Sequence, residues 1–241
     1  MKISVVVPAF NEEKLLARSL AAITGACAAF AGRGWSWEIV VCDNNSTDRT
    51  ADIARAAGAI VVFEPINQIA RARNCGAAAA TGDWLIFVDA DSFPSTALFA
   101  ATADRIARGN CGGGGCLVTL DEQILALRFA VGIWNTISRL NRWAAGSYIF
   151  TRADLFREIG GFSNELFASE ELDLSKRLKA VAKKRGLRFT IITEQRLVTS
   201  ARKVHLYGHR EHLRFLFKAM LRPRATITNR EKCVLWYDGR R

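Results

Sequence analysis

The chain has 241 residues, half of them apolar, and a formal net charge of +11. This is enough apolar material for one substantial core, so a single α/β domain is the expected organisation. The apolar run before Pro8 is too short for a signal peptide, and no later run reaches the roughly 20 residues that a membrane-spanning helix needs. These observations argue against an integral membrane protein, and we expect a cytoplasmic one.

The first hundred residues alternate short apolar runs with helix-like segments, which is typical of parallel strands joined by crossover helices. The runs are hydrophobic almost throughout, as expected for strands buried on both faces. The predicted strands are 3–7, 38–42, 59–63 and 84–88, and the predicted helices are 11–31, 47–57, 70–80 and 94–109. Asn11 and Ser46 are capping-type residues that we expect to open two of these helices.

Beyond the glycine run 112–115 the alternation is less regular. A strand, a helix near 121–140 and another strand near 146–151 are predicted there. Because the sequence contains no repeat, no low-complexity tract and no Pro-rich linker, we expect both halves of the chain to share one sheet. The fold class is therefore α/β, with a mostly parallel central sheet flanked by helices.

The six cysteines are scattered without a C-x-x-C pair, and several lie within apolar patterns. We interpret them as reduced packing residues. Cys111 and Cys116 flank the glycine run, but two thiols at that spacing give only a weak zinc signal.

Positive charge is concentrated near the C-terminus, where residues 176–241 contain 19 Lys and Arg against 4 Asp and Glu. Such a region can attract phosphates, anionic lipids or nucleic acid, or can simply be a solvated face. Within it, 209–221 has the apolar spacing of a basic amphipathic helix. We expect that helix to pack on its own domain, the alternative being a membrane surface.

Polar residues follow three of the predicted strands at the carboxyl ends, where open parallel sheets bind ligands. Asn11 follows the first strand, Asp43 ends the second, and Asp89 and Asp91 follow the fourth. In extended backbone, two residues so spaced point to the same side, so both aspartates could hold Mg²⁺ or Mn²⁺ shared with a diphosphate. Ordinary turns and solvated carboxylates are the alternatives.

Five segments together resemble the inverting family 2 glycosyltransferases, which have the nucleotide-diphospho-sugar transferase fold called GT-A. The segments are VVVPAFNEE at 5–13, VVCDNNSTD at 40–48, ARARNCGAAAATGDWLIFVDADS at 70–92, GSYIFTRADLFREIGGF at 146–162 and ASEELDLSKRLK at 168–179. The resemblance implies a GT-A domain at 1–200, with a nucleotide-sugar half at 1–111 and an acceptor half at 112–200. A basic helical extension, 201–241, would pack on it.

The resemblance also implies which residues bind the donor. Those residues are Pro8, Ala9, Asn11, Glu12, Asp43, Asn45, Arg73, Asp89, Ala90 and Asp91. Asp89-Ala90-Asp91 looks like the D-x-D motif of the family, with Asp91 the direct metal ligand and Asp89 nearer the ribose or sugar. Some relatives complete the metal shell with a histidine, for which His205 is the best-placed candidate and His209 and His212 are alternatives.

The catalytic base of the family normally comes from a Glu-Asp pair at the start of a helix, and here the matching pair is Glu170-Glu171, followed by Asp173. Glu171 occupies the matching position, but its side chain is longer by one methylene. Carboxylates at a helix N-terminus also complement the helix dipole without catalysing anything. Glu171 is the preferred base, with Glu170 and Asp173 as alternatives.

The expected function is therefore metal-assisted, inverting transfer of a sugar from a UDP- or GDP-linked donor to an acceptor hydroxyl. The acceptor, which is a glycan, a lipid-linked molecule or a small molecule, is not identified. Trp134 and Trp143 would line an acceptor wall or fill the core. The alternatives are an inactive nucleotide-sugar-binding protein and a nucleic-acid-binding module, and the second leaves the five segments without a role.

Overall fold

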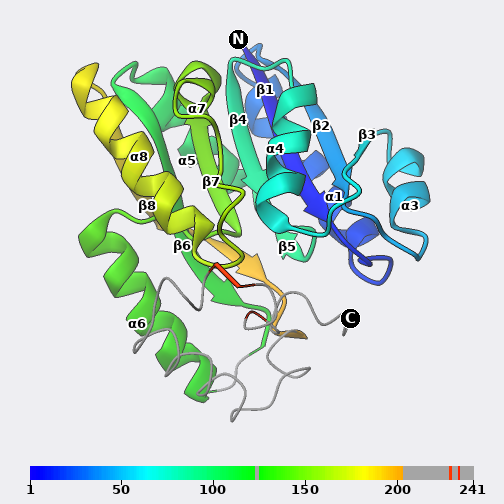
Figure 1. The fold of residues 1–241 in the computed structure, drawn as a ribbon. Coiled ribbons are helices and arrows are strands. Elements are labelled where there is room, and N and C mark those ends of the chain that lie inside the picture. The colour runs from blue at the N-terminus through cyan, green and yellow to red at the C-terminus, as the bar shows by residue number, and fades with distance from the viewer. Residues whose placement is uncertain (123–124, 203–227, 230–232, 234–241) are drawn as a thin grey trace.

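The fold was examined in a computed structural model, which describes residues 1–122, 125–202, 228, 229 and 233 (Figure 1). A mixed sheet forms the middle layer, and helices cover both of its faces. No helix in this part of the chain combines the length and hydrophobicity needed to cross a membrane. Residues 203–227, which contain the amphipathic segment 209–221 and all three histidines, lie outside the described part.

The sheet has eight strands in the order β3-β2-β1-β4-β7-β6-β8-β5 within the described chain, and both halves of the sequence contribute to it, as expected. β1 to β4 run parallel, whereas β7 is antiparallel to both of its neighbours. The sheet is thus mixed, and parallel pairings are in the majority, as expected. Its strands are β1 (Lys2–Ala9), β2 (Ser36–Asp43), β3 (Ile60–Phe63), β4 (Trp84–Val88), β5 (Ser92–Phe93), β6 (Cys111–Leu120), β7 (Tyr148–Arg152) and β8 (Arg188–Thr199).

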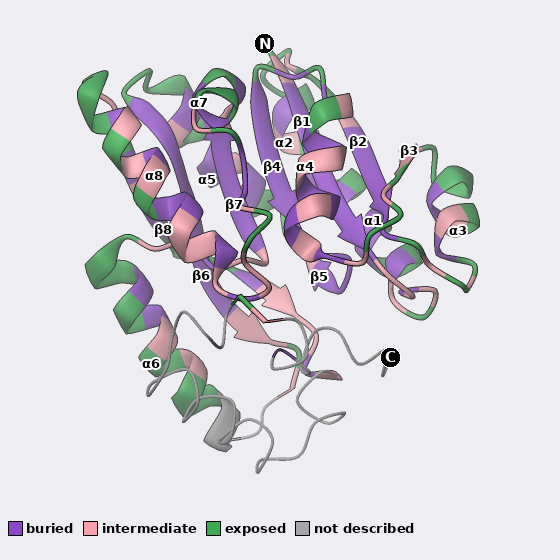
Figure 2. Cartoon of the chain, viewed as in Figure 1, coloured by how far each residue is buried: buried purple, intermediate pink, exposed green. Residues whose placement is uncertain are grey.

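The sheet divides the hydrophobic core into two clusters, one on each of its faces, and helices cover both. α1, α2 and α5 pack on one face, and α4, α7 and α8 on the other (Figure 2). Alternate residues of β1, such as Val5 and Val6, face opposite clusters, as the two-residue period of a strand requires. The helices are α1 (Leu16–Ala26), α2 (Ala28–Ala31), α3 (Thr50–Ala56), α4 (Ile69–Ala79), α5 (Thr96–Ala107), α6 (Leu125–Asn141), α7 (Ala153–Glu158) and α8 (Glu170–Lys184).

The four predicted N-terminal strands are all present, with two differences. β3 is an edge strand with Ile60 and Phe63 largely exposed, so it is not buried on both faces. Pro8 does not end β1, which continues to Ala9 and pairs with β2. The pairing of β1 with β4 stops at Val6, so the missing N–H of Pro8 leaves no gap in that ladder.

Neither Asn11 nor Ser46 caps a helix, which corrects that expectation. The residues that precede α1 and α3 are Leu15 and Arg49. Neither Leu15 nor Arg49 makes a side-chain capping bond. Both helices start three or four residues later than the polar residues suggested, because those side chains bond to each other's loops instead of to a helix end.

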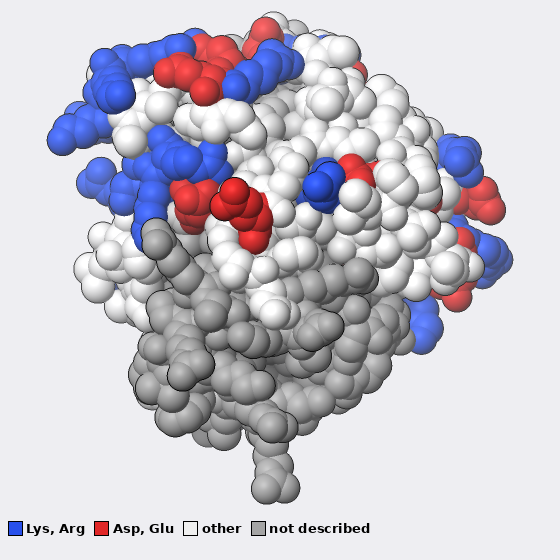
Figure 3. Space-filling view, in the orientation of Figure 1, with Lys and Arg blue, Asp and Glu red and all other residues white. Residues whose placement is uncertain are grey.

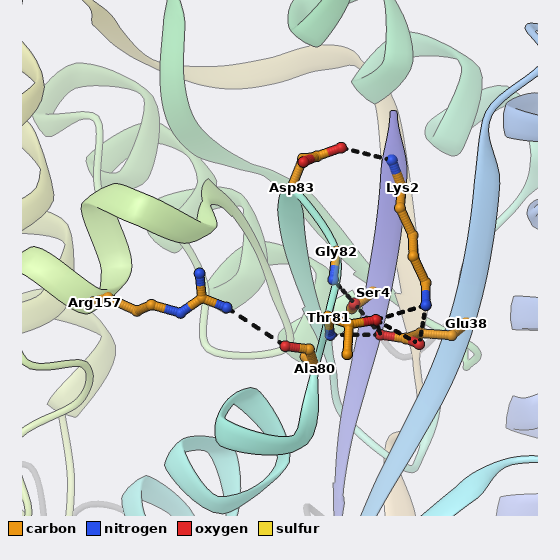
Figure 4. Close-up of polar contacts among 8 residues, drawn as sticks. All are labelled: Lys2, Ser4, Glu38, Ala80, Thr81, Gly82, Asp83 and Arg157. Atoms are coloured by element: carbon orange, nitrogen blue, oxygen red, sulfur yellow. Dashed lines mark hydrogen bonds and ion pairs between the residues drawn. The ribbon is translucent and has the colours of Figure 1, made fainter.

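The amino ends of β1, β2 and β4 are joined around Glu38 (Figure 4). Its carboxylate accepts hydrogen bonds from Ser4 Oγ at 2.6 Å and from the Thr81 amide at 2.7 Å, and it pairs with Lys2 Nζ at 2.5 Å. Burial raises its pKa, but these donors lower it to about 2 overall. This network fixes the end of the sheet that is opposite the carboxyl ends described below.

The glycine run 112–115 forms the part of β6 that lies between β7 and β8. A Cβ added to Gly114 would lie 2.0 Å from the carbonyl oxygen of Thr190 and 2.8 Å from Cζ of Phe150. Side chains here would push the neighbouring strands apart. The run is therefore a packing requirement of the sheet and not a loop.

We predict that Gly114→Ala destabilises the protein by at least about 3 kcal/mol, because neither contact can relax without moving a strand. Gly25→Ala is the matched control, since a Cβ there meets nothing within 4 Å and Gly25 lies inside α1. It should stabilise the protein by about 0.5–1 kcal/mol. Urea unfolding of both variants tests this, and equal stabilities would contradict it.

Candidate functional site

The loops that follow β1 and β2 are bonded to each other at the carboxyl edge of the sheet. The Asn11 amide donates to Ser46 Oγ at 3.0 Å, and Asn11 Oδ1 accepts from the Thr47 amide at 2.8 Å. Asp43 Oδ1 accepts from the Ser46 amide at 3.0 Å. Asn11 has a φ of 51°, a left-handed conformation that asparagine tolerates better than most residues. The two loops therefore form one rigid rim.

The residues expected to bind the donor differ in their exposure along this rim. Ala9, Glu12 and Asp43 are buried, whereas Asn45 is exposed and its side chain donates to Asn67 Oδ1 at 3.0 Å. Pro8 lies within β1 and is buried with it. The structure thus brings these residues to one edge, with Asn45 on the outside.

Asp89, Ala90 and Asp91 form a turn between β4 and β5, in which the Ser92 amide donates to the Asp89 carbonyl at 3.0 Å. The expectation of extended backbone here is wrong, because β4 ends at Val88. Asp91 is buried at 3 % exposure, and its carbonyl accepts from the Ser200 amide at 3.0 Å. Turn geometry, not strand alternation, positions the two carboxylates.

Arg73 of α4 connects this turn to the start of α8. Its guanidinium donates to Glu170 Oε1 at 2.6 Å, to Asp89 Oδ1 at 3.0 Å and to the Gly146 carbonyl at 2.8 Å. It also lies over the ring of Phe162, 5.1 Å from the centroid. With 1 % exposure, Arg73 is not a helix-surface charge. The structure places it beneath the site, between two carboxylates.

The three candidate bases at the start of α8 have different surroundings. Glu170 is buried against Arg73, and Asp173 pairs with Arg177 at 2.7 Å. Glu171 is half-buried, has no salt bridge within the described chain, and lies beside Gly146, 3.7 Å from where a Cβ on that glycine would be. Ser169, just before the helix, has a φ of 61°, a strained conformation of the kind that clusters at functional sites.

The pKa of Glu171 is raised to about 8. Burial is the main cause and the charge of Glu170 the second, and Arg73 only partly opposes them. Burial raises a carboxyl pKa because the ionised form loses its hydration. Glu171 therefore has a pKa raised toward neutral pH, and within the described chain it is the candidate whose carboxyl is not paired with a cation.

Arg202, which follows β8, reaches back to the first loop. Its Nη2 pairs with Glu12 Oε2 at 2.5 Å. Its Nε and Nη1 are buried and have no hydrogen-bond partner among the residues that the structure describes. Buried donors without partners are costly, so this guanidinium is suited to receive an anionic ligand.

The aspartate turn suits a divalent cation that is shared with a ligand. Asp89 and Asp91 supply hard oxygen ligands, and Mg²⁺ usually binds one or two carboxylates together with substrate phosphates. No group of three or more His, Cys, Asp and Glu converges as a metal site in the described part of the chain. His205 lies outside that part, so its role as a ligand stays a prediction.

Two side chains at the site were not anticipated from the sequence. Asn44 Nδ2 donates to the carbonyls of Glu64 and Ile66, and its Oδ1 accepts from the Gln68 amide at 2.9 Å. Gln68 Nε2 in turn donates to Asn164 and Leu166 carbonyls at 2.8 and 2.9 Å. The polar run around Asn44 was visible in the sequence, but its partners are distant in the chain.

The remaining candidates from the sequence are the two tryptophans and the six cysteines. Trp134 packs partly against the core, and Trp143 lies 5.5 Å from Lys176 Nζ in a cation–π contact. All six cysteines are free, and all except Cys75 are buried. This agrees with their interpretation as packing residues.

Comparison with known proteins supports the family resemblance that the sequence shows. Residues 4–120 match the family described as Glycosyl transferase family 2. An uncharacterized glycosyltransferase of Mycobacterium tuberculosis is 40 % identical over 89 residues, covering 37 % of this chain and 36 % of the relative. Glycosyltransferase AglE of Haloferax volcanii is 24 % identical, covering 73 % of this chain and 60 % of the relative. The chain thus spans about a third of the length of the first of these relatives.

Solved structures share the fold. The mannosyltransferase PcManGT from Pyrobaculum calidifontis, in complex with GDP-Man and Mn²⁺, has a TM-score of 0.66 and 21 % identity, covering 91 % of this chain and 61 % of its own. S. aureus TarS in complex with UDP-GlcNAc has a TM-score of 0.62 and 17 % identity, covering 98 % and 69 %. At these identities the likeness establishes the fold.

We predict that Arg73→Met lowers the free energy of unfolding by about 3–5 kcal/mol, because it leaves the buried Glu170 and the partly buried Asp89 without a cation. Arg55→Met is the control, since the pair of Arg55 with Asp52 is exposed and should contribute no more than about 0.5 kcal/mol. Urea unfolding measures both. A loss below about 1 kcal/mol for Arg73→Met would show that the buried pairs do not hold the site together.

Proposed function

We propose that this chain, whose residues 4–120 match glycosyl transferase family 2 and which has the GT-A fold, transfers a sugar from a nucleotide diphosphate donor to an acceptor hydroxyl with inversion. One observation carries the proposal. Asp89 and the Glu170-Glu171 pair, about eighty residues apart, meet around Arg73 and Gly146. A donor held at the aspartate turn would thus lie next to a carboxyl group able to accept a proton.

The donor would lie against the rim made by the first two loops. We assign Asp43 and the backbone at Pro8 and Ala9 to binding of the nucleoside. All three residues belong to the nucleotide-sugar half proposed for 1–111. The diphosphate would lie between Asp91 and Arg202, whose two unpartnered N–H groups would donate to its oxygens. The acceptor would approach from 112–200, with 201–241 packed on the domain.

Asp91 and Asp89 would hold Mn²⁺ or Mg²⁺ together with that diphosphate. Such an ion supplies charge neutralisation for the departing nucleotide. The carboxylates around the turn would otherwise repel a diphosphate, which is the physical reason for a cation at this place. The Mn²⁺ in the complex of PcManGT is consistent with this assignment.

Glu171 would act as the base. Its carboxylate would accept the proton of the acceptor hydroxyl while that oxygen forms a bond to the anomeric carbon from the face opposite the diphosphate. The bond from the anomeric carbon to the diphosphate oxygen breaks, and its electron pair leaves with the nucleotide. Glu170 would hold Arg73 in place, and Asp173 would remain paired with Arg177.

We predict metal-dependent binding of one nucleotide diphosphate. Calorimetric titration with UDP, GDP, ADP and TDP should give binding in Mn²⁺ that chelator abolishes. Asp91→Asn should weaken it at least about a hundredfold, because a charged ligand is lost at constant size. Asp52→Asn, an exposed carboxylate on α3, is the control and should bind as the wild type does. Absence of binding by every nucleotide would refute the donor site.

We also predict a pH profile set by Glu171. With a pKa of about 8, kcat/KM should rise about tenfold per pH unit below that value and level off above it, because only the ionised carboxylate accepts a proton. Glu171→Gln should lower kcat by about 10²–10⁴-fold and leave nucleotide affinity unchanged. A wild-type profile that is flat from pH 6 to 9 would exclude a base with a pKa of about 8. Nucleotide binding with no transfer or donor hydrolysis would indicate an inactive binding protein.

A further inference from the structure

α6 is apolar on two opposite faces. One face packs on the sheet through Val131 and Trp134, and Asn135 bonds to both the amide and the carbonyl of Val118 at 3.0 and 2.9 Å. The opposite face carries Phe129, Ile133, Ile137 and Leu140, which are 72, 49, 38 and 74 % exposed. A helix that is apolar all round normally has partners on both sides.

The exposed residues form a continuous strip along the helix. They follow one another at intervals of three or four residues, which places them on one side. Beside them lies a groove of about 460 Å³ lined by Arg128, Phe129, Gly132, Ile133, Thr136 and Ile137. Within the part of the chain that the structure describes, all of the lining comes from α6, so the groove is a feature of this helix surface. Contiguous exposed apolar strips of this kind mark docking sites.

The charges around the strip identify its partner. Arg128 and Arg139 are exposed on α6, Arg142 follows it, and residues 125–146 contain no Asp or Glu. Lys176 and Lys179 of α8 lie next to this segment, since Lys179 Nζ donates to the Asn141 carbonyl at 2.7 Å and Lys176 contacts Trp143. Figure 3 shows that the Lys and Arg side chains over α8 are interspersed with Asp and Glu, so only the cations next to α6 count as the border of the strip.

We propose that the exposed face of α6 docks on an anionic lipid bilayer. An apolar strip bordered by cations, on a segment without Asp or Glu from 125 to 146, matches the interface between acyl chains and anionic headgroups. The strip would enter the headgroup region, and Arg128, Arg139 and Arg142 would contact phosphates at its border. None of the residues of this strip belongs to the amphipathic segment 209–221.

The docked helix leads directly to the site. Residues 142–145 connect α6 to Gly146, whose carbonyl accepts a hydrogen bond from Arg73. The carbonyl of the next residue, Ser147, accepts from the Asp89 amide at 3.3 Å. Membrane binding would thus bring the site to acceptors anchored in the bilayer. That consequence rests on the proposed function, whereas docking itself does not.

The test is co-sedimentation of the full chain with vesicles of phosphatidylcholine, alone or mixed with phosphatidylglycerol. The wild type should bind the anionic vesicles in a salt-sensitive manner. Phe129→Ser combined with Leu140→Ser should lower partitioning at least about tenfold, because both side chains would lose their lipid contact. Ile60→Ser, at an exposed apolar residue of edge strand β3, is the matched control and should bind as the wild type does.

A second pair of variants tests the charges. Arg128→Glu with Arg139→Glu should weaken binding to anionic vesicles at least about twentyfold, since each arginine near the surface contributes about fivefold. Arg108→Glu, an exposed arginine just after α5, should have no effect. The Asp91→Asn variant should bind vesicles normally, so failure of the donor site and failure of docking are distinguishable.

Three results would overturn the proposal. If the wild type co-sediments with neither anionic nor neutral vesicles, no docking occurs. A fall in melting temperature of the Phe129 and Leu140 variant, with unchanged partitioning, would mean that another part of this chain covers the strip. A dimer in sedimentation equilibrium that this variant dissociates would identify a second copy as the partner.

Discussion

The buried guanidinium of Arg73 is the interaction on which the site depends. It belongs to α4, in the first half of the sequence, yet its partners include Glu170 of α8 and the Gly146 carbonyl. A cation without water is stable only when carboxylates surround it, and carboxylates so placed need the cation in return. Asp89 and α8 are therefore held in a fixed relation that neither half of the chain could maintain alone.

The same electrostatic arrangement separates the acids of α8 by role. Glu170 uses its charge to neutralise Arg73, and Asp173 uses its own on Arg177. Glu171 lies between them in sequence, is near the negative charge of Glu170, and has its pKa raised to about 8. Three carboxylates within one helical turn thus differ in their electrostatic surroundings, because two of them pair with an arginine and the third does not.

The carboxyl edge of the sheet is rigid for a different reason. Asn11 and Ser46 bond across two loops, and Asn44 and Gln68 continue the network toward Asn164 and Leu166. Nearly all of these bonds join a side chain to a backbone group, so the loops keep their shape without regular secondary structure. A preformed rim of this kind reduces the ordering cost of binding a ligand.

The sequence by itself determined the alternation of strands and helices, the residues at the carboxyl ends of β1, β2 and β4, and the resemblance to a glycosyltransferase family. These follow from local periodicity and from short motifs, which a linear pattern records. It did not determine that Asp89 and Asp91 lie in a turn, that β7 is antiparallel in the middle of the sheet, or that Arg73 is buried beneath the site. Those features depend on contacts between residues far apart in the chain, and burial and pKa are properties of such contacts. The resemblance already preferred Glu171 over Glu170 and Asp173, but the physical argument for that choice needs the tertiary structure, because it depends on which carboxylates are already paired with an arginine.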